Sequence, residues 1–347
     1  MRSMRLREVE VGCIGGGTGL PSLLGGLKTN PWLKVNAVVT TFDSGGSSGL
    51  LRDQLGVLPP GDILKCALAL ARNEAEARRV LLSRLPSLEH ARLAGHTGGN
   101  LLLSMMERHS GDVIAAIDGL RALLGCRGRV WPASVEQSSI CAEFADGSRT
   151  CGEVEVDAGQ REGRGVRRLW LDPSPSLHRE VAAAIGGFET AIIGPGSFFT
   201  SLMPPLLVDG MAAALRAIEG PIVLVANLLT EGRGMNGFTA ADEARWIGET
   251  IRRPVDVVVL NTAVPSAETL ERYASEQKHP LQAGALPPSC EVIEGAFWDG
   301  AIARHSRRRL SYAIWSVIAR RLLDAPVAAE RLGEGVPLDS VLGARPI

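Results

Sequence analysis

The feature that most constrains this fold is a strand, a glycine-rich turn, a helix and a second strand near the start of the chain. Residues 9–14 (VEVGCI) predict a strand that runs into Gly15-Gly16-Gly17, and the pattern over 21–28 is helical. Residues 35–41 (VNAVVTT) are apolar on both faces, which is typical of a buried parallel strand. Together these segments predict a βαβ unit.

The same alternation resumes in the second half of the chain. It predicts helices and strands in turn: helices 177–186, 205–218, 240–252 and 266–276, and strands 190–193, 221–226 and 255–260. Helical patterns also cover 61 to about 109, with breaks near Pro86 and Gly95, and 112–124. A basic amphipathic helix is predicted over 306–323, with Arg307, Arg308 and Arg309 on a solvated face.

The stretch between these halves has a different character. Short alternating runs over 128–171, with turn signals at Asp146-Gly147 and Asp157-Ala158-Gly159, indicate antiparallel strands. We therefore predict an α/β fold, a doubly wound parallel sheet with an inserted antiparallel β-rich segment. The α/β domain is predicted over residues 1–127 and 173–325. The insertion covers residues 128–172, and a C-terminal tail covers residues 326–347.

Charge and composition exclude several classes of protein. Lys and Arg number 37 against 38 Asp and Glu, a net charge of −1, which argues against a dedicated binder of nucleic acid or anionic membranes without excluding a local basic patch. No apolar window is long enough for a membrane span, and the N-terminal apolar run is too short for a signal peptide. Six cysteines without CxxC spacing or a His/Cys cluster predict a reduced cytoplasmic protein with free thiols.

Glycine is the unusual part of the composition. The chain has 40 glycines, whereas average usage of about 7% would give roughly 24. Nineteen of them fall in five short stretches, within 15–26, 45–61, 95–99, 194–196 and 232–237. Glycine is tolerated where backbone takes positive φ or approaches a ligand closely. We therefore interpret the excess as backbone shaped around a ligand.

Two of these stretches are loops that follow a predicted strand and precede a predicted helix, GGGTGL (15–20) and GPGSFFTS (194–201). In this setting backbone N–H groups bind phosphate, although a tight turn without a ligand is the alternative. GGGTGL is neither a strict dinucleotide fingerprint, because Leu20 replaces the third glycine, nor a P-loop. The predicted ligand-binding residues here are Gly15, Gly16, Gly17, Thr18, Gly19, Gly194, Pro195, Gly196, Ser197 and Thr200.

The segment TTFDSGGSSGLLRD (40–53) places Asp43 just past the second strand. We predict a flexible loop that wraps phosphates or presents Asp43 to Mg²⁺, with Arg52 as a phosphate clamp. A surface loop with a solvated aspartate is the alternative. The predicted binding residues are Ser44, Gly45, Gly46, Ser47 and Arg52.

Three further segments carry polar residues at helix starts or strand ends. Asp62 of LPPGDI is either an N-cap or first-turn acid of a helix, or a second metal or substrate ligand. His96 of AGHTGGN is a candidate acid/base or hydrogen-bond donor, unless this is a loop with a cap at Thr97. Asn100, and Asn227 and Thr230 of VANLLTEG, are candidate contacts to a polar ligand, whereas Asn261 is interpreted as structural and 232–237 as a mobile loop.

The strand ends of a doubly wound sheet converge on one ligand site. Catalytic roles are predicted for Asp43, Asp62 and His96, and metal binding for Asp43 and Asp62. No GxSxG, HExxH or paired-carboxylate motif indicates a hydrolase. The pattern suits a nucleoside diphosphate or nucleotide sugar as partner, with Mg²⁺, and leaves the oligomeric state open, a homo-oligomer included.

Six motifs in this order resemble the gluconeogenesis factor and 2-phospho-L-lactate transferase superfamily: GGGTGL, DSGGSSGLLRD, LPPGDI, GHTGGN, GPGSFFTS and NLLT. The resemblance covers about residues 9–275 and implies a Rossmann-like fold that binds nucleotides or their conjugates. One branch of the superfamily moves a phospholactyl group from a guanylyl donor to a deazaflavin alcohol with Mg²⁺. The other binds UDP-sugars and affects carbon use, cell-wall precursor flow and cell shape, and this chain's motifs match it better.

The resemblance also assigns roles to residues. It implies that Gly15–Gly19 and Gly194–Ser197 hold phosphates, that Asp43 is the metal-side or phosphate-side acid, and that Asn227 lies near the base or sugar. The chain departs from the family pattern at three places. Ser44 stands where a second aspartate is usual, Glu231 begins a loop that normally carries a Gln and a Gly-Glu-Thr run, and Glu243 replaces an expected His. Ligand specificity is therefore expected to differ.

Overall fold

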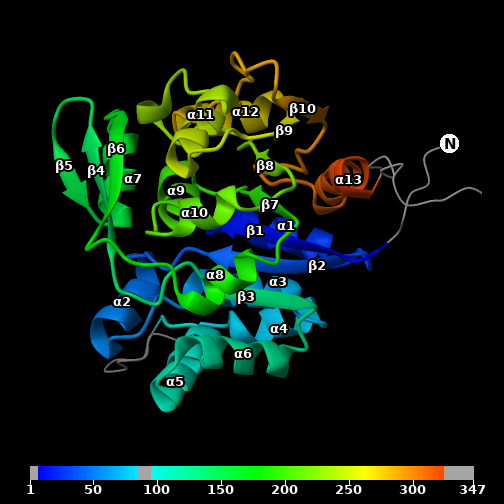
Figure 1. Ribbon diagram of the computed structural model, residues 1–347. Helices are drawn as coiled ribbons and strands as arrows, with labels where there is room; N and C mark the ends of the chain where they lie inside the picture. The colour runs from blue at the N-terminus through cyan, green and yellow to red at the C-terminus, as the bar shows by residue number, and fades with distance from the viewer. Residues whose placement is uncertain (1–6, 85–94, 324–347) are drawn as a thin grey trace, which may run out of the picture.

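A seven-stranded, fully parallel sheet forms the centre of the molecule (Figure 1). The computed structural model describes residues 7–84 and 95–323. The strand order is β10-β9-β8-β7-β1-β2-β3. The strands are β1 (Val9–Gly15), β2 (Leu33–Val39), β3 (Gly128–Pro132), β7 (Thr190–Ile193), β8 (Ile222–Val225), β9 (Val257–Asn261) and β10 (Glu291–Gly295). The predicted α/β, doubly wound architecture is confirmed.

Successive strands are added on one side of β1 in the first half of the chain and on the other side in the second half. From β1 the chain proceeds outward through β2 to β3, and from β7 it proceeds through β8 and β9 to β10 on the other side. Right-handed crossovers in opposite directions place helices on opposite faces of such a sheet. β1 and β7 are direct neighbours, with Cys13 opposite Ile192. Their carboxyl ends are therefore the topological switch point.

The helices divide into two groups that pack on the sheet. The first half contributes α1 (Gly19–Leu27), α2 (Gly46–Leu55), α3 (Gly61–Leu70), α4 (Glu74–Leu81), α5 (Gly98–Ser110) and α6 (Val113–Leu124). The second half contributes α8 (Arg179–Ile185), a π-turn (Phe198–Leu202), α9 (Met203–Leu206), α10 (Met211–Arg216), α11 (Ala240–Ile251), α12 (Ala267–Ser275) and α13 (Arg307–Ile318). No helix in the described ranges could cross a membrane.

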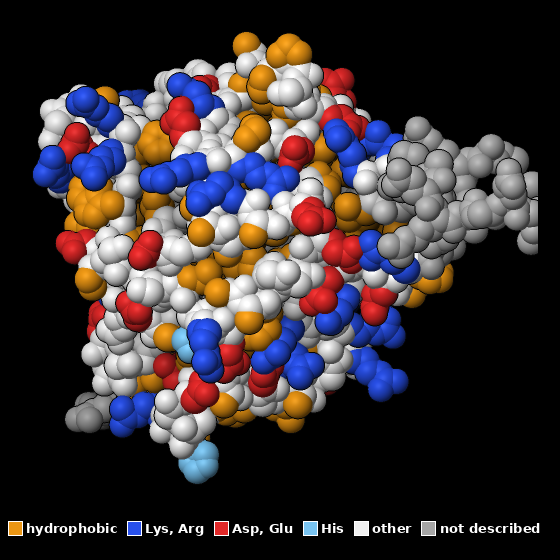
Figure 2. All heavy atoms as spheres, in the orientation of Figure 1, with side chains coloured by type: hydrophobic (Ala, Val, Ile, Leu, Met, Phe, Trp, Pro, Cys, Tyr) orange, Lys and Arg blue, Asp and Glu red, His pale blue; other side chains and the backbone are white. Residues whose placement is uncertain are grey.

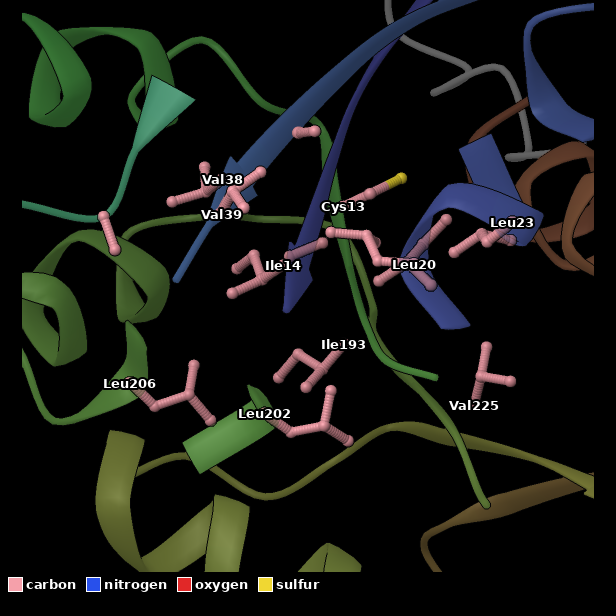
Figure 3. Close-up of a cluster of buried hydrophobic side chains, with 14 of the residues drawn as sticks. Cys13, Ile14, Leu20, Leu23, Val38, Val39, Ile193, Leu202, Leu206 and Val225 are labelled. Atoms are coloured by element: carbon pink, nitrogen blue, oxygen red, sulfur yellow. The ribbon is translucent and has the colours of Figure 1, made fainter. Parts of the chain in front are cut away.

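The core lies between this sheet and α1 (Figure 3). Leu20, Leu23, Leu24 and Leu27 of α1 are fully buried, at the spacing that puts them on one face of a helix. They meet Cys13, Ile14 and other strand residues that are buried on both faces of the sheet, as expected for parallel strands. The switch point is therefore held by rigid elements.

Helix α13 packs against α1 through two glycines. A Cβ atom at Gly26 would lie 2.6 Å from the carbonyl oxygen of Arg307, so only glycine admits this approach. The guanidinium of Arg307 donates to both carboxylate oxygens of Glu74, at 3.0 and 2.8 Å. Arg307, whose side chain is 42% exposed, thereby ties α13 to α4, and Arg308 and Arg309 are exposed, as the predicted solvated helix face requires.

The predicted insertion forms a small antiparallel sheet of β4 (Ser139–Phe144), β5 (Arg149–Cys151) and β6 (Val166–Asp172), in the order β5-β4-β6. Two corrections apply here. β3 pairs with β2 in the main sheet, so the insertion begins after Pro132 instead of at 128. Residues predicted as a turn around 157–159 belong to α7 (Glu153–Arg161), where Gly159 packs directly on the ring of Phe144.

Cysteine pairing differs from the sequence-based expectation. Cys141 and Cys151 are direct partners across the β4–β5 pair and form a disulfide. The prediction of six free thiols is therefore wrong for these two residues. Cys13, Cys66, Cys126 and Cys290 are free. Antiparallel register brings the two thiols together, and spacing along the sequence carries no sign of that register.

Two predicted loops contain regular structure. The Ser- and Gly-rich segment expected as a flexible loop forms α2, which ends at Gly56 in the left-handed conformation with φ 68°. The loop over 232–237 contains a short 3₁₀ turn, Arg233–Met235. The break predicted near Pro86 and the tail at 326–347 lie outside the described residues.

The packing of β7 predicts a stability effect. Ile193 is fully buried in Figure 3, between β1 and β8. We expect Ile193→Ala to lower the free energy of unfolding by about 2–5 kcal/mol, because it removes buried methyl groups and leaves a cavity. The exposed Val264 (82% exposed) is the control, and Val264→Ala should change it by less than about 0.5 kcal/mol. Urea denaturation followed by circular dichroism measures both, and equal effects would contradict this account of the core.

Candidate functional site

The two glycine-rich turns after β1 and β7 touch each other at the switch point. A Cβ atom at Gly19 would lie 2.4 Å from the carbonyl oxygen of Pro195, and one at Gly196 would lie 3.1 Å from that of Gly16. Gly17 has φ 64°, in the left-handed region. Glycine at these positions lets the turns approach with no side chain between them. Backbone N–H groups from both turns are thereby gathered at one place.

A pocket of about 450 Å³ opens beside this contact. Its volume falls in the range of small-molecule sites. It joins the start of α1, the GPGSFFTS loop, the segment after β8 and the segment before α13. The lining residues include predicted and unpredicted ones: Thr18, Gly19, Ser22, Pro195, Gly196, Ser197, Asn227, Leu228, Leu229, Thr230, Glu231, Tyr273, Lys278, Ile302, Ala303, Arg304 and His305.

Helix α1 begins at this pocket without a side-chain cap. Its N-cap residue, Thr18, has helical backbone angles, and its side chain caps no N–H group. The first turn of a helix carries N–H groups without intrahelical partners and a partial positive charge. Thr18, Gly19 and Ser22 of this first turn line the pocket. This end of α1 is thus able to bind an anion.

Asp62 supports the first turn from behind. Its Oδ2 accepts a hydrogen bond from Gly17 N, and its Oδ1 forms a 2.8 Å ion pair with Lys65. Asp62 is 5% exposed and lies in the first turn of α3, whose N-cap is Pro60, so it does not cap that helix. Both carboxylate oxygens are therefore occupied by groups of the protein. Of the two predicted metal ligands, Asp43 is the less engaged.

Asp43 lies next to a carboxyl group that sequence reasoning did not identify. Its Oδ1 accepts from Gly45 N at 2.7 Å, and its carboxylate forms a hydrogen bond with Glu153 at the start of α7. Ser44 also joins Glu153, because Glu153 N donates to Ser44 Oγ at 2.9 Å and Ser44 N donates to the Glu153 carboxylate at 3.3 Å. Burial, followed by the nearby Asp43 charge, raises the pKa of Glu153 to about 9. Glu153 therefore carries a proton at neutral pH and can donate it to Asp43.

Ser47, His96 and Asn100 form a buried hydrogen-bonded group behind Asp43. Asn100 Nδ2 donates to Ser47 Oγ at 3.1 Å, and Ser47 Oγ lies 2.8 Å from His96 Nδ1. Ser47 Oγ therefore bridges Asn100 and His96, and the histidine tautomer decides whether Ser47 Oγ or His96 Nδ1 is the donor. Asn100 N donates to Thr97 Oγ1, so the predicted cap at Thr97 is present. His96 is 2% exposed and does not line the pocket.

The GPGSFFTS loop is filled by side chains from the segment after β8. Gly196 N donates to Asn227 Oδ1 at 3.4 Å. Ser197 Oγ and Phe198 N both donate to Glu231 Oε2, at 2.9 and 3.0 Å. Two donors of the predicted phosphate cradle are therefore bound to a carboxylate of the protein itself.

Asn227 lies at the centre of the site and has an unpaired donor. The residue is 8% exposed, and its Nδ2 has no hydrogen-bond partner among the described residues. Its backbone N donates to Glu243 Oε2 at 3.3 Å, and Glu243 is fully buried, with Oε1 likewise unpaired. Burial raises the pKa of Glu243 well above its ordinary value. An unpaired buried amide indicates a place for a ligand acceptor.

The predicted residues thus fall into two adjoining groups. The first group lines the pocket and consists of Thr18, Gly19, Pro195, Gly196, Ser197, Asn227 and Thr230. Gly15, Gly16, Gly17 and Gly194 belong to the same two turns but are not part of the lining. The second group surrounds the start of α2 and consists of Asp43, Ser44, Gly45, Ser47, His96 and Asn100. Asp62 bonds to Gly17 of the first turn. Gly46 begins α2, Thr200 Oγ1 is bonded to Ser197 Oγ, and Arg52 pairs with Asp53 at 2.8 Å.

Several site residues carried no recognisable signal in the sequence. Lys278, Arg304 and His305 line the pocket from segments with no motif, and Glu153 reaches Asp43 across 110 positions of the chain. His305 is 6% exposed, and burial lowers its pKa to about 4, so it is neutral. Asn261 is structural as predicted, since its Oδ1 accepts from the backbone of Phe297.

Two observations concern candidate sites elsewhere in the described residues. The described residues include no group of three or more His, Cys, Asp or Glu side chains that could hold a metal ion. A larger cavity, about 910 Å³, lies at the amino ends of β1, β2 and β3, away from the switch point. Charged groups there pair with each other, such as Lys34 with Glu10 at 3.0 Å. On the face shown in Figure 2, Lys and Arg side chains lie among Asp and Glu side chains, in keeping with the near-zero net charge.

Comparison with known proteins finds a matching family model and several relatives. A family model described as 2-phospho-L-lactate transferase CofD matches residues 11–298. Putative gluconeogenesis factors from Nostoc sp. and Deinococcus radiodurans are 38% and 39% identical over 79% and 78% of this chain, which spans 60% and 57% of their lengths. One from Aquifex aeolicus is 32% identical over 92% of this chain and 99% of its own.

A solved structure resembles the whole described fold. The crystal structure of a UPF0052 family member from Bacillus halodurans superposes with a TM-score of 0.82 at 32% identity. The match covers 90% of this chain and 100% of that one. It contains the region from β1 to β10 that forms the pocket.

The close contact between the two turns predicts that one added methyl group at Gly19 lowers the stability of the fold. Gly19→Ala places Cβ against the backbone at Pro195, which cannot move without moving the turn. We expect a loss of about 1–3 kcal/mol in the free energy of unfolding. Gly98, whose Cβ would have no neighbour closer than 3.9 Å, is the matched control, and Gly98→Ala should stay within about 0.5 kcal/mol. If thermal unfolding shows no difference between the two variants, the turns do not meet as described.

Proposed function

This chain belongs to the 2-phospho-L-lactate transferase CofD family, and from that premise we propose that it binds a nucleotide sugar of the UDP-sugar type in the pocket at the switch point. The observation that carries the proposal is the uncapped start of α1, which opens into a pocket beside the unpaired Nδ2 of Asn227. The helix end suits the diphosphate. The amide suits a carbonyl of the base or an oxygen of the sugar.

The rest of the pocket suits the other parts of such a ligand. Leu228, Leu229 and Tyr273 give it an apolar wall on which a base can lie. Lys278 and Arg304 add two positive charges to the lining, next to the helix end. A site that holds phosphate with backbone N–H groups and a few cations needs no large basic surface. The net charge of −1 agrees with such a site.

A regulatory role in the cytoplasm follows from this proposal and from the relatives. Relatives at 32–39% identity carry the name gluconeogenesis factor, which points to carbon metabolism. We propose that the chain senses nucleotide-sugar supply and thereby affects carbon use, cell-wall precursor flow and cell shape. This chain spans 57–60% of the length of the Nostoc and Deinococcus relatives. The proposed role therefore concerns only the part of those proteins that aligns with this chain.

Mg²⁺ fits the donor set at one place. The carboxyl of Glu153 carries a proton beside Asp43, and a hard cation could replace that proton. We propose that Asp43 would hold Mg²⁺ together with ligand phosphates, where the ion would neutralise phosphate charge. Asp62 is bound to Lys65 and Gly17, so its part would be to position the first turn of α1.

The alternative is an enzyme, favoured by the Asp43–Glu153 pair next to the Ser-rich start of α2. In a 2-phospho-L-lactate transferase reaction, an alcohol oxygen of a deazaflavin attacks the lactyl phosphorus of a guanylyl donor. The P–O bond to guanylate breaks, and the alcohol proton passes to a base, for which the Asp43 side chain is the candidate. Product formation from these two substrates with Mg²⁺ would establish this alternative, and Asp43→Asn should abolish it.

Binding is tested directly by calorimetry with UDP-glucose, UDP and GDP. We expect Asn227→Ala to weaken UDP-glucose binding about 10- to 100-fold, because the ligand loses a hydrogen bond in a buried place. Asn236→Ala, which changes an exposed asparagine in the following loop, is the control and should bind as the wild type does. Mass spectrometry of any small molecule released on denaturation gives an independent identification. Binding of none of these ligands by the wild type would refute the proposal.

A further inference from the structure

The carboxylate of Glu231 occupies the donors of the GPGSFFTS loop. Its Oε2 accepts from Ser197 Oγ at 2.9 Å and from Phe198 N at 3.0 Å, where the chain enters the π-turn that precedes α9. A hydroxyl and a backbone N–H that converge on one oxygen are the arrangement by which proteins hold a phosphate oxygen. Glu231 is therefore bound to its own protein as an anionic ligand would be.

The two turns at the switch point each hold a carboxylate, but only one is neutralised at close range. Asp62, at the first turn, forms an ion pair with Lys65 at 2.8 Å. Glu231, at the second, has no ion pair within 4 Å among the described residues. It also lines the pocket, whereas Asp62 lies behind the turn. A ligand that enters the pocket therefore approaches the Glu231 carboxylate from the same side as the donors that this carboxylate occupies, Ser197 Oγ and Phe198 N.

We propose that Glu231 competes with the ligand phosphate for Ser197 Oγ and Phe198 N, so that the phosphate takes these donors only when Glu231 is protonated and gives them up. Ligand binding then takes up one proton, and the site binds more tightly at lower pH. This inference rests on the proposed function, because it assigns a form of regulation to the same pocket. Under this proposal, Glu231 determines how the affinity for the ligand depends on pH.

The charged groups around Glu231 come from four elements. Asp157 of α7 and Glu243 of α11 are acidic neighbours, and Lys278, after α12, is the cation that acts on it. Arg304 and His305, before α13, line the same pocket. Burial raises the pKa of Glu231 to about 7, and Asp157 adds to the rise, while the bonds from Ser197 and Phe198 and the charge of Lys278 oppose it.

Neighbouring groups differ from Glu231 in what they contact. Burial raises the pKa of Glu243 well above the ordinary value, and Glu243 accepts from the backbone N of Asn227 and not from the cradle donors. Burial lowers the pKa of His305 to about 4, so it stays neutral. The Asp157 pKa is also raised by burial, yet Asp157 is bonded to Thr200 and not to the cradle donors. Glu231 is the group whose protonation would change the donors themselves.

The sign and size of the effect follow from linkage. Below its pKa Glu231 is neutral and competes weakly, and above it the carboxylate holds the cradle. For one group with a pKa of about 7, the affinity should fall about tenfold between pH 6 and about pH 8, with about one proton taken up per ligand at the higher pH. Glu231→Gln keeps the size and the acceptor oxygen but has no charge to lose.

The test is calorimetry with UDP-glucose, whose diphosphate does not titrate in this range, at both pH values and in two buffers of different ionisation enthalpy. We expect the wild type to show the tenfold fall and the proton uptake. Glu231→Gln should show neither, and should bind about tenfold more tightly than the wild type at the higher pH. Glu268→Gln, which removes an exposed carboxylate on α12, is the matched control and should behave as the wild type does.

The outcomes separate this inference from the proposed function. If wild type and Glu231→Gln bind UDP-glucose with the same dependence on pH, the competition is refuted while the binding site stands. If the proton uptake persists in Glu231→Gln and disappears in Glu243→Gln, Glu243 carries the proton and the assignment to Glu231 is wrong. If neither wild type nor Glu231→Gln binds at either pH, and both unfold cooperatively, the proposed function itself fails.

Discussion

The backbone contact between the turns after β1 and β7 is the constraint on which the rest of the site depends. Gly19 and Pro195 approach so closely that a single Cβ would separate them. The contact requires β1 and β7 to be adjacent, with the two halves of the chain leading away on either side. Any ligand at this edge is therefore enclosed by N–H groups from both halves. The sheet order and the ligand site are consequences of the same arrangement.

One N–H group of each turn is bonded to a carboxylate of the protein. Asp62 accepts from Gly17 N, and Glu231 accepts from Phe198 N. Buried N–H groups without partners are costly, so an anion site without a ligand needs some internal acceptor. Asp62 is matched by Lys65 and can remain in place, whereas Glu231 has no such partner. The difference in pairing separates a structural carboxylate from an exchangeable one.

Periodicity predicted β1, β2, β7, β8 and β9 because these strands are buried on both faces. The strand predicted over 190–193 coincides with β7, and the one over 9–14 differs from β1 by one residue. β10 was not predicted, since it is an edge strand with exposed Glu294 and part-exposed neighbours. The repeat in EVEV (153–156) suggested a strand, but α7 forms there because Gly159 lets the helix pack on Phe144.

The site was predictable only where a residue stands at a strand end or in a glycine-rich turn. Asn227 and Ser197 belong to such segments, so sheet topology brings them together. Glu153 belongs to the insertion, and nothing local marks it as a partner of Ser44, to which it is joined by two hydrogen bonds. The sequence departure at Glu231 was visible, but its consequence depends on the 2.9 Å distance to Ser197 Oγ.

The insertion is part of the site because of where it is attached. Cys151 ends β5 and is joined to Cys141, and Glu153, two residues later, begins the helix that holds Ser44 and faces Asp43. The disulfide limits how far β5 can move away from β4, and so limits the movement of Glu153. Asp157, one turn further along α7, reaches Thr200 of the second cradle. A single short helix therefore contacts both the Asp43 group and the GPGSFFTS loop, which couples the two halves of the site through the insertion.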